Sequence, residues 1–197
     1  MWDERYATAG YLFGKRPAQF LVDQKANLEH EARALAVADG EGRNSVYMAE
    51  QGLDVVAMDG SPVAVEKAKK LAAERGVAVD FRVADIFAWD WKPEAYGLVV
   101  AIFIQFMGPA DRKRVFEAMV RTLRPGGTLL LHGYRPEQLA YGTGGPPQEA
   151  NMYTEALLRD AFGDMEIVRL ASYDRAMDEG RGHSGMSALI DLVAKKR

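Results

Sequence analysis

The chain has 197 residues, of which 48% are hydrophobic and 27% charged, and its formal net charge is −3. This length and balance predict one globular domain over residues 1–197, and the weak negative charge disfavours nucleic acid as the main partner. The sequence contains no cysteine and only three histidines, so we expect no metal site. No run of about 18 apolar residues and no export signal is visible, so we expect a cytoplasmic protein without membrane contact.

Short apolar runs separated by turn residues predict the strands. They lie at residues 34–37, 54–58, 78–83, 97–104, 128–132, 166–171 and 187–194. Helical periodicity between the earlier runs predicts a mostly parallel sheet. The last two runs are separated only by an aperiodic segment, which favours a C-terminal antiparallel hairpin. The expected fold is therefore a Rossmann-like α/β domain with seven strands and helices on both faces.

The helices carry recognisable start and stop signals. Ser61 followed by a proline predicts a helix start, and Gly76 predicts its end. A second helix is expected over residues 111–123, with Arg112 on its water-facing side. A third begins after Thr154, which can accept a hydrogen bond from the first turn.

The most informative segment is residues 38–45, Ala-Asp-Gly-Glu-Gly-Arg-Asn-Ser, which follows the first strand and opens a helix. The apolar face of that helix is expected to run through Val46 and Ala49 to Leu53. Gly40 and Gly42 allow a tight turn and close approach of a ligand, and free N–H groups at the helix start favour an anionic group. An ordinary strand-to-helix turn is the alternative, because a Gly-x-Gly pattern alone is weak.

Acidic residues follow the next two strands. Asp59 lies near the spacing of about 20 residues at which an acid binds a ribose after a glycine loop, although it also suits a helix-capping turn. Asp85 precedes Ile86, and the pair could bind the amine and the face of an adenine. These acids meet at one edge of a parallel sheet, where they would repel a pyrophosphate. The pattern favours S-adenosylmethionine, which carries a sulfonium and an ammonium, over NAD or ATP.

Residues 39–49 resemble the first motif of class I S-adenosylmethionine-dependent methyltransferases and are similar to that of the small tellurite-resistance methyltransferases. The resemblance covers about residues 32–131 and implies that residues 1–30 form a cap or helix segment over the cofactor. It implies cofactor contacts from Tyr11, Ala38, Asp39, Gly40, Gly42, Arg43, Asn44, Asp59, Gly60, Ser61, Ala84, Asp85, Ile86, Ala101 and Phe103.

Two residues depart from the pattern of this family. An acid commonly stands where this chain has Ala36, and its loss removes an indirect support of the cofactor's amino group. A glycine commonly stands where this chain has Ala38. Alanine fits there if its φ is negative.

Methyl transfer from a sulfonium requires alignment of the acceptor, and a base is optional. We expect a small-molecule acceptor such as a thiol or a tellurium or selenium oxyanion, S-adenosylhomocysteine as the product, and a monomer or homodimer. The sequence singles out no catalytic residue. Residues 141–147 form either a lid or a plain surface loop. The candidates for the acceptor pocket are Gln105, His132, Tyr134 and His183.

Two alternatives remain open on the sequence. The first is a non-catalytic protein that binds S-adenosylmethionine or another metabolite, because Ala36 and Ala38 alter the cofactor loop. The second is an NAD-dependent oxidoreductase, since the same loop is not far from the dinucleotide fingerprint.

Overall fold

The computed structural model describes residues 2–28 and 33–197, so residues 29 and 30 of the expected cap lie outside the described residues. None of the described helices has both the length and the apolar character that a membrane span requires. The elements in chain order are α1 (Trp2–Tyr6), α2 (Gln19–Asp23), η1 (Lys25–Asn27), β1 (Arg33–Val37), α3 (Arg43–Glu50), β2 (Asp54–Asp59), α4 (Pro62–Arg75), β3 (Asp80–Val83), β4 (Tyr96–Ile102), α5 (Pro109–Thr122), β5 (Leu123–Tyr134), α6 (Gln138–Tyr141), η2 (Glu149–Asn151), α7 (Glu155–Ala161), β6 (Glu166–Asp178) and β7 (Ser184–Lys195).

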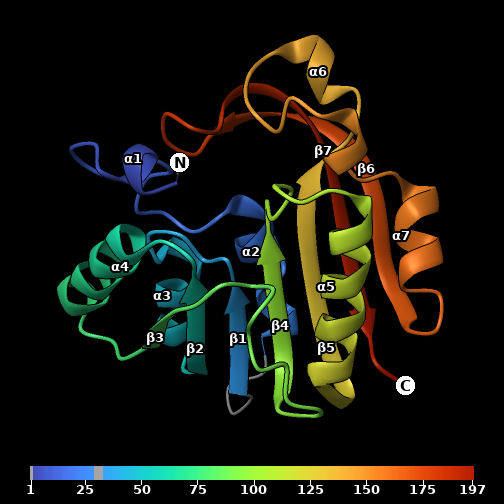
Figure 1. Cartoon of the computed structure of the whole chain (residues 1–197), viewed down its shortest axis with the longest axis horizontal. Coiled ribbons are helices and arrows are strands. Elements are labelled where there is room, and N and C mark those ends of the chain that lie inside the picture. The colour runs from blue at the N-terminus through green and yellow to red at the C-terminus, as the bar shows by residue number, and fades with distance from the viewer. Residues whose placement is uncertain (1, 29–32) are drawn as a thin grey trace.

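The strands form one seven-stranded sheet in the order β3-β2-β1-β4-β5-β7-β6 (Figure 1). Neighbouring strands from β3 through β5 pair in parallel, whereas β7 pairs antiparallel with both β5 and β6. The predicted Rossmann-like α/β fold with a C-terminal hairpin is therefore confirmed.

Helices cover both faces of this sheet. On one face, Leu35 and Val37 of β1 belong to a core cluster that includes residues of α5 and α7. On the other face, Ala34 and Ala36 pack in a cluster with residues of α2 and α3. Because both faces of the central strands are buried, their sequences are continuously apolar instead of alternating.

Local signals placed most helix ends correctly. The Ser61 hydroxyl accepts a hydrogen bond from Ala64 N–H at 3.1 Å, and α4 ends at Gly76 with φ of 68°. Thr154 caps α7 in the same way, accepting from Leu157 N–H at 3.1 Å. These residues adopt the roles that their side chains predict.

Three expectations differ from the structure. Helix α3 ends at Glu50, so Leu53 lies beyond it, in the turn before β2. Arg112 is buried and donates a hydrogen bond to the Ala150 carbonyl at 2.6 Å, because the segment after β5 folds back over α5. Strands β6 and β7 extend well into the segment expected as a connection, 174–185, because their pairing continues to Asp178 and Ser184.

The N-terminal segment and the β6–β7 hairpin meet over the carboxyl edge of the sheet, where Figure 1 shows the hairpin curving toward α1. Gly182 N–H donates to the Leu12 carbonyl at 3.2 Å. In turn, Leu12 N–H donates to the Glu41 carboxylate at 2.7 Å, and Glu41 forms a buried ion pair with Lys67 at 2.8 Å. These contacts join the first residues, the loop after β1, helix α4 and the hairpin.

The junction depends on a close approach at Gly182. A Cβ atom at this position would lie 2.2 Å from the Phe13 ring. We predict that Gly182→Ala lowers the free energy of unfolding by about 1–3 kcal/mol, as overpacking does in protein cores. Denaturant unfolding measures this change.

The control is the same substitution in a Phe13→Ala background, where the ring is absent. There the added methyl group should cost clearly less, because neighbouring mutations that share a contact are not additive. Equal costs in the two backgrounds would show that this contact does not hold the junction together.

Candidate functional site

A cavity of about 1040 Å³ lies at the carboxyl ends of the central strands, beneath the N-terminal segment and the hairpin. Twelve of the fifteen cofactor residues predicted from sequence line it. These twelve are Ala38, Asp39, Gly40, Arg43, Asn44, Asp59, Gly60, Ser61, Ala84, Asp85, Ile86 and Phe103.

The loop after β1 contains an alanine in an unfavourable backbone conformation. Ala38 has φ of 48°, so the negative φ at which alanine would fit this position is not adopted. The left-handed region is open to glycine but costs other residues about 1 kcal/mol or more. The residue that replaces the usual glycine therefore carries backbone strain at the wall of the cavity.

Gly40 and Gly42 each allow a close approach, but to different parts of the molecule. A Cβ atom on Gly40 would lie 2.9 Å from the Tyr6 hydroxyl, which lines the cavity. A Cβ atom on Gly42 would lie 2.7 Å from the Ala68 Cβ atom. Gly42 therefore allows α3 and α4 to approach each other, and it lies outside the cavity.

Asp39 is a half-buried acid in the cavity wall. Its carboxylate accepts hydrogen bonds from the Ser45 hydroxyl and from Ser45 N–H, the latter at 3.2 Å. Burial raises the pKa of Asp39 to about 7, although the bonds from Ser45 oppose this shift, and the charge of Asp59 raises it further. The site thus contains a carboxyl group that titrates near neutral pH.

Asp59 ends β2 and accepts backbone hydrogen bonds from Gly40 and from Ser61, each at 2.8 Å. Burial raises its pKa, while these two bonds lower it. An ionised carboxylate can accept about four hydrogen bonds, so capacity for two more remains. Ser61 both caps α4 and donates its hydroxyl proton to Asp3. The capping and ligand-binding interpretations of this turn are therefore compatible.

The segment after β3 adds an accessible apolar surface to the cavity. Asp85 accepts a hydrogen bond from Phe87 N–H at 2.9 Å, and Ile86 beside it is buried. Val83 is 54% exposed and Phe87 is 45% exposed, although both are large apolar residues lining the cavity. Such a surface suits a flat ring that becomes covered on binding.

Two predicted contacts line the cavity but already have protein partners. Arg43 forms a buried ion pair with Glu179 of the hairpin at 2.8 Å. The Asn44 side-chain oxygen accepts a hydrogen bond from Ala18 N–H at 2.9 Å. Both side chains therefore anchor covering segments, and the charge of Arg43 is compensated before any ligand binds.

Two other predicted cofactor residues, besides Gly42, lie outside the cavity. The Tyr11 hydroxyl donates to the Lys67 carbonyl at 3.0 Å. Ala101 is fully buried in the core, because alternate residues of β4 point to opposite faces of the sheet.

Of the acceptor-pocket candidates, Gln105, Tyr134 and His183 line the main cavity. The Gln105 side chain holds the end of β5: its oxygen accepts from Tyr134 N–H at 2.7 Å, and its amide donates to the Tyr134 carbonyl at 2.8 Å. In the loop expected as a possible lid, Gly145, Pro146 and Pro147 also line the cavity.

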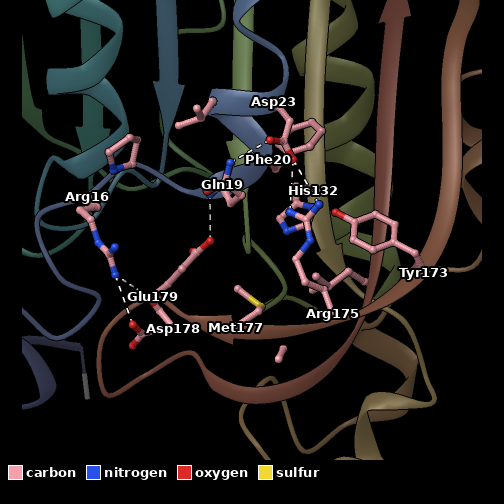
Figure 2. Close-up of a pocket in the computed structure, with 14 residues that line it drawn as sticks. Arg16, Gln19, Phe20, Asp23, His132, Tyr173, Arg175, Met177, Asp178 and Glu179 are labelled. Atoms are coloured by element: carbon pink, nitrogen blue, oxygen red, sulfur yellow. Dashed lines mark hydrogen bonds and ion pairs between the residues drawn. The ribbon is translucent and has the colours of Figure 1, made fainter.

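His132 lies instead beside a second cavity of about 510 Å³, shown in Figure 2. Its Nδ1 atom is 2.8 Å from an oxygen of Asp191, with which it pairs across β5 and β7. The ring of Phe20 stacks on it at 4.8 Å. Phe20 of α2 covers one side of His132, and the Phe103 ring contacts both His132, at 4.8 Å, and His183, at 4.2 Å.

Sequence reasoning missed an aromatic wall. Trp2 stacks on Tyr6 at 5.6 Å and meets the edge of Phe106 at 6.5 Å. Phe13 meets Tyr6 at 6.3 Å, and all four residues line the cavity. The resemblance predicts that residues 1–30 cover the cofactor, but it does not reveal which rings meet there, and Phe106 lies far from them in the sequence.

Comparison with known proteins finds a matching domain in the first two thirds of the chain. Residues 34–127 match a methyltransferase domain. A 2-heptyl-1-hydroxyquinolin-4(1H)-one methyltransferase of Mycobacteroides abscessus is 31% identical over 94 residues, which are 47% of this chain and 41% of that protein. A carboxy-S-adenosyl-L-methionine synthase of Yersinia pestis is 38% identical over 84 residues, covering 41% of this chain and 31% of that protein.

Solved structures agree in fold. TehB from Haemophilus influenzae superposes with a TM-score of 0.73 at 18% identity, covering 100% of this chain and 66% of that one. A SAM-dependent methyltransferase from Methanosarcina mazei gives 0.73 at 17% identity, covering 87% of this chain and 95% of that one. The chain therefore has the fold of these solved structures, and residues 34–127 match a methyltransferase domain. The chain spans less than half the length of the curated relatives it matches.

The described residues contain no group of three or more histidines and acids arranged to hold a metal ion.

The strain at Ala38 predicts an unusual response to substitution. Ala38→Gly should leave the free energy of unfolding unchanged or raise it by up to about 1 kcal/mol, because glycine accepts the left-handed conformation. The same change at Ala36, within β1, should lower it by about 0.5–1 kcal/mol. Equal destabilisation by both substitutions in chemical denaturation would contradict the strain at residue 38.

The raised pKa of Asp39 predicts a pH dependence of stability. The folded pKa of about 7 exceeds the ordinary value of 3.8, so the folded state holds the proton more tightly than the unfolded state. This contribution to stability is fully present below about pH 4 and is lost as the pH rises through 7. Asp39→Asn removes the titration, so the variant should lose about 2–3 kcal/mol less than the wild type between pH 5 and pH 8.

Parallel stability curves for the two proteins, measured by urea unfolding at each pH, would contradict this assignment.

Proposed function

We propose that this protein transfers a methyl group from S-adenosylmethionine to a small-molecule acceptor. One observation carries the proposal. A single cavity contains both the acids that follow β1, β2 and β3 and the aromatic side chains of Phe103, Tyr134 and His183. The acidic part suits a cationic nucleoside, and the aromatic part suits an organic acceptor beside it. The methyltransferase domain of residues 34–127 supports the same chemistry.

The charges of the cavity fit this cofactor. Four acids line it, namely Asp3, Asp39, Asp59 and Asp85. A dinucleotide pyrophosphate would be repelled here, whereas a molecule with a sulfonium and an ammonium would be attracted. This balance favours S-adenosylmethionine over NAD.

Each part of the cofactor has a matching group in this chain. Asp59 would accept the ribose hydroxyls, and the segment 84–86 would hold the adenine. The backbone N–H groups at the start of α3 would meet the carboxylate. When bound, the cofactor supplies a methyl group on a positively charged sulfur.

The residues around the acceptor would act by alignment and by exclusion of water. The lone pair of the acceptor forms a bond to the methyl carbon as the carbon–sulfur bond breaks and its electrons remain on sulfur. Alignment of this in-line displacement needs a closed and preorganised pocket. Trp2, Phe13 and Phe103 supply the apolar walls, and Gln105 fixes the end of β5 that carries Tyr134.

The proposed acceptor carries an electron-rich oxygen or sulfur atom. A thiol or a tellurium or selenium oxyanion fits the expectation from sequence, since each provides such an atom without a dedicated base. The aromatic walls further favour a planar organic compound, and the Mycobacteroides abscessus relative is named for a hydroxyquinolone. We therefore place thiols and hydroxylated heteroaromatic compounds first among acceptors, with tellurite and selenite next.

Calorimetric titration with S-adenosylhomocysteine tests the cofactor assignment. The wild type should bind with a Kd between micromolar and low millimolar, and Asp59→Asn should weaken binding at least tenfold, because the ribose hydroxyls lose an ionised acceptor. The control, Asp54→Asn, changes the exposed start of the same strand and should bind as the wild type does. Absence of heat with both S-adenosylmethionine and S-adenosylhomocysteine would refute the proposal.

A methyl-transfer assay separates an enzyme from a non-catalytic relative. Thiols, hydroxyquinolones, phenols, amines, tellurite and selenite are each offered with S-adenosylmethionine, and S-adenosylhomocysteine is measured. Turnover of at least one acceptor is expected. Tight cofactor binding without turnover of any of them would favour a metabolite-binding protein instead.

A further inference from the structure

His183 is held rigidly at the wall of the cavity. Its ring stacks on Phe13 with centroids 4.5 Å apart and on Phe103 with centroids 4.2 Å apart, both at an interplanar angle of 25°. Only 7% of the residue is exposed. Because aromatic rings pack against it, the imidazole can form polar contacts only through its edge.

The inner edge of that ring has a defined partner. Nδ1 of His183 lies 2.5 Å from the hydroxyl oxygen of Tyr134, which is buried at the end of β5. Burial raises the pKa of Tyr134, although Arg43 and a hydrogen bond from the Ser187 side chain oppose this shift. The phenol therefore keeps its proton at neutral pH, and a buried O–H group without an acceptor would cost about 1–3 kcal/mol. Nδ1 of His183 and the Ser187 hydroxyl are the two groups beside this phenol, and Nδ1 lies within hydrogen-bonding distance of it.

The direction of this hydrogen bond sets the position of the imidazole proton. Burial lowers the pKa of His183, as do the charges of Arg43 and other cations, so the ring is neutral. A neutral imidazole has one N–H group, and if Nδ1 accepts, the proton resides on Nε2. No group in the described part of the chain is hydrogen-bonded to Nε2, and the ring lines the cavity.

We propose that His183 donates a hydrogen bond from Nε2 to the methyl acceptor and does not serve as its base. The acceptors that fit are nucleophiles already deprotonated in solution: a thiolate, an oxyanion, or the ionised hydroxyl of a planar heteroaromatic ring. One lone pair receives the hydrogen bond and another forms the bond to the methyl carbon, so no proton leaves during transfer. This inference rests on the proposed function and specifies the class of acceptor.

A second observation supports an anionic acceptor. The Arg5 guanidinium lies 4.4 Å from the centre of the Trp2 ring, and both residues line the cavity. Among the described residues, no carboxylate forms an ion pair with Arg5, in contrast to Arg43. Its positive charge therefore remains available to an anion that enters the aromatic part of the site.

The tautomer of His183 is measurable without cofactor or acceptor. Long-range ¹H–¹⁵N correlation spectra of the ¹⁵N-labelled protein at pH 7.5 distinguish the two tautomers, and the chain has only three histidines to assign. We expect the Nε2–H form for His183 in the wild type and loss of this fixed tautomer in Tyr134→Phe. A wild-type ring with its proton on Nδ1 would overturn the proposal.

Two substitutions of His183 then distinguish a hydrogen-bond donor from a general base. His183→Gln keeps an N–H donor but cannot take a proton, and His183→Ala removes both functions. With a thiol or hydroxyquinolone acceptor, kcat/KM should fall less than tenfold in the glutamine variant and about 10- to 150-fold in the alanine variant, as expected for a hydrogen bond to a charged group. Equal losses in both variants, with unchanged thermal unfolding and unchanged Kd for S-adenosylhomocysteine, would indicate a base and overturn the proposal.

Failure of the proposed function gives a different result. A protein that methylates no acceptor would contradict methyl transfer, and the NMR spectra would still decide which nitrogen of His183 carries the proton.

Discussion

The parallel pairing of β1 with both β2 and β4 is the constraint on which the site depends. It aligns the carboxyl ends of these strands at one edge, and the strand order reverses between β1 and β4. Open α/β sheets bind ligands in the crevice at such a reversal. The glycine loop, Asp59 and Asp85 follow three successive strands, so their convergence is a consequence of topology. The same geometry brings Phe103 and Tyr134, which follow β4 or end β5, to the other side of the crevice.

Buried ion pairs connect the N-terminal segment and the β6–β7 hairpin to the carboxyl edge of the sheet. Glu41 pairs with Lys67, and Arg43 pairs with Glu179 of the β6–β7 hairpin. Buried pairs contribute little net stability because desolvation offsets their attraction, but loss of one partner is costly. Their role here is positional: they fix the loop after β1 against α4 and against the hairpin. Movement of the β6–β7 hairpin away from the sheet would therefore disturb the loop after β1, which is proposed to hold the cofactor.

Much of the fold, and the residues that line the cavity at the ends of β1, β2 and β3, could be predicted from sequence because the signals are local. A capping serine, a glycine after a helix and an acid after a strand each act within a few residues, as Ser61, Gly76 and Asp59 show. The hairpin was predicted from the absence of helical periodicity. Its length was not predicted, because the largely exposed strand β6 lacks a regular pattern of apolar residues.

The acceptor half depends on contacts between distant parts of the chain. Trp2, Phe13 and His183 meet only after the N-terminal segment and the hairpin fold over the edge. His132 was a reasonable candidate by position, but Phe20 of α2 covers its ring, and no local pattern reveals that contact. The positive φ of Ala38 was equally inaccessible, because it is imposed by the turn that the whole loop must make.

The most direct test of this account is a crystal structure of the protein with S-adenosylhomocysteine. If the cofactor binds as proposed, electron density fills the cavity of about 1040 Å³, with the ribose against Asp59 and the sulfur facing the side of the cavity that Phe103 and His183 line. Density in the second cavity beside His132, or an empty main cavity at millimolar ligand, would contradict it.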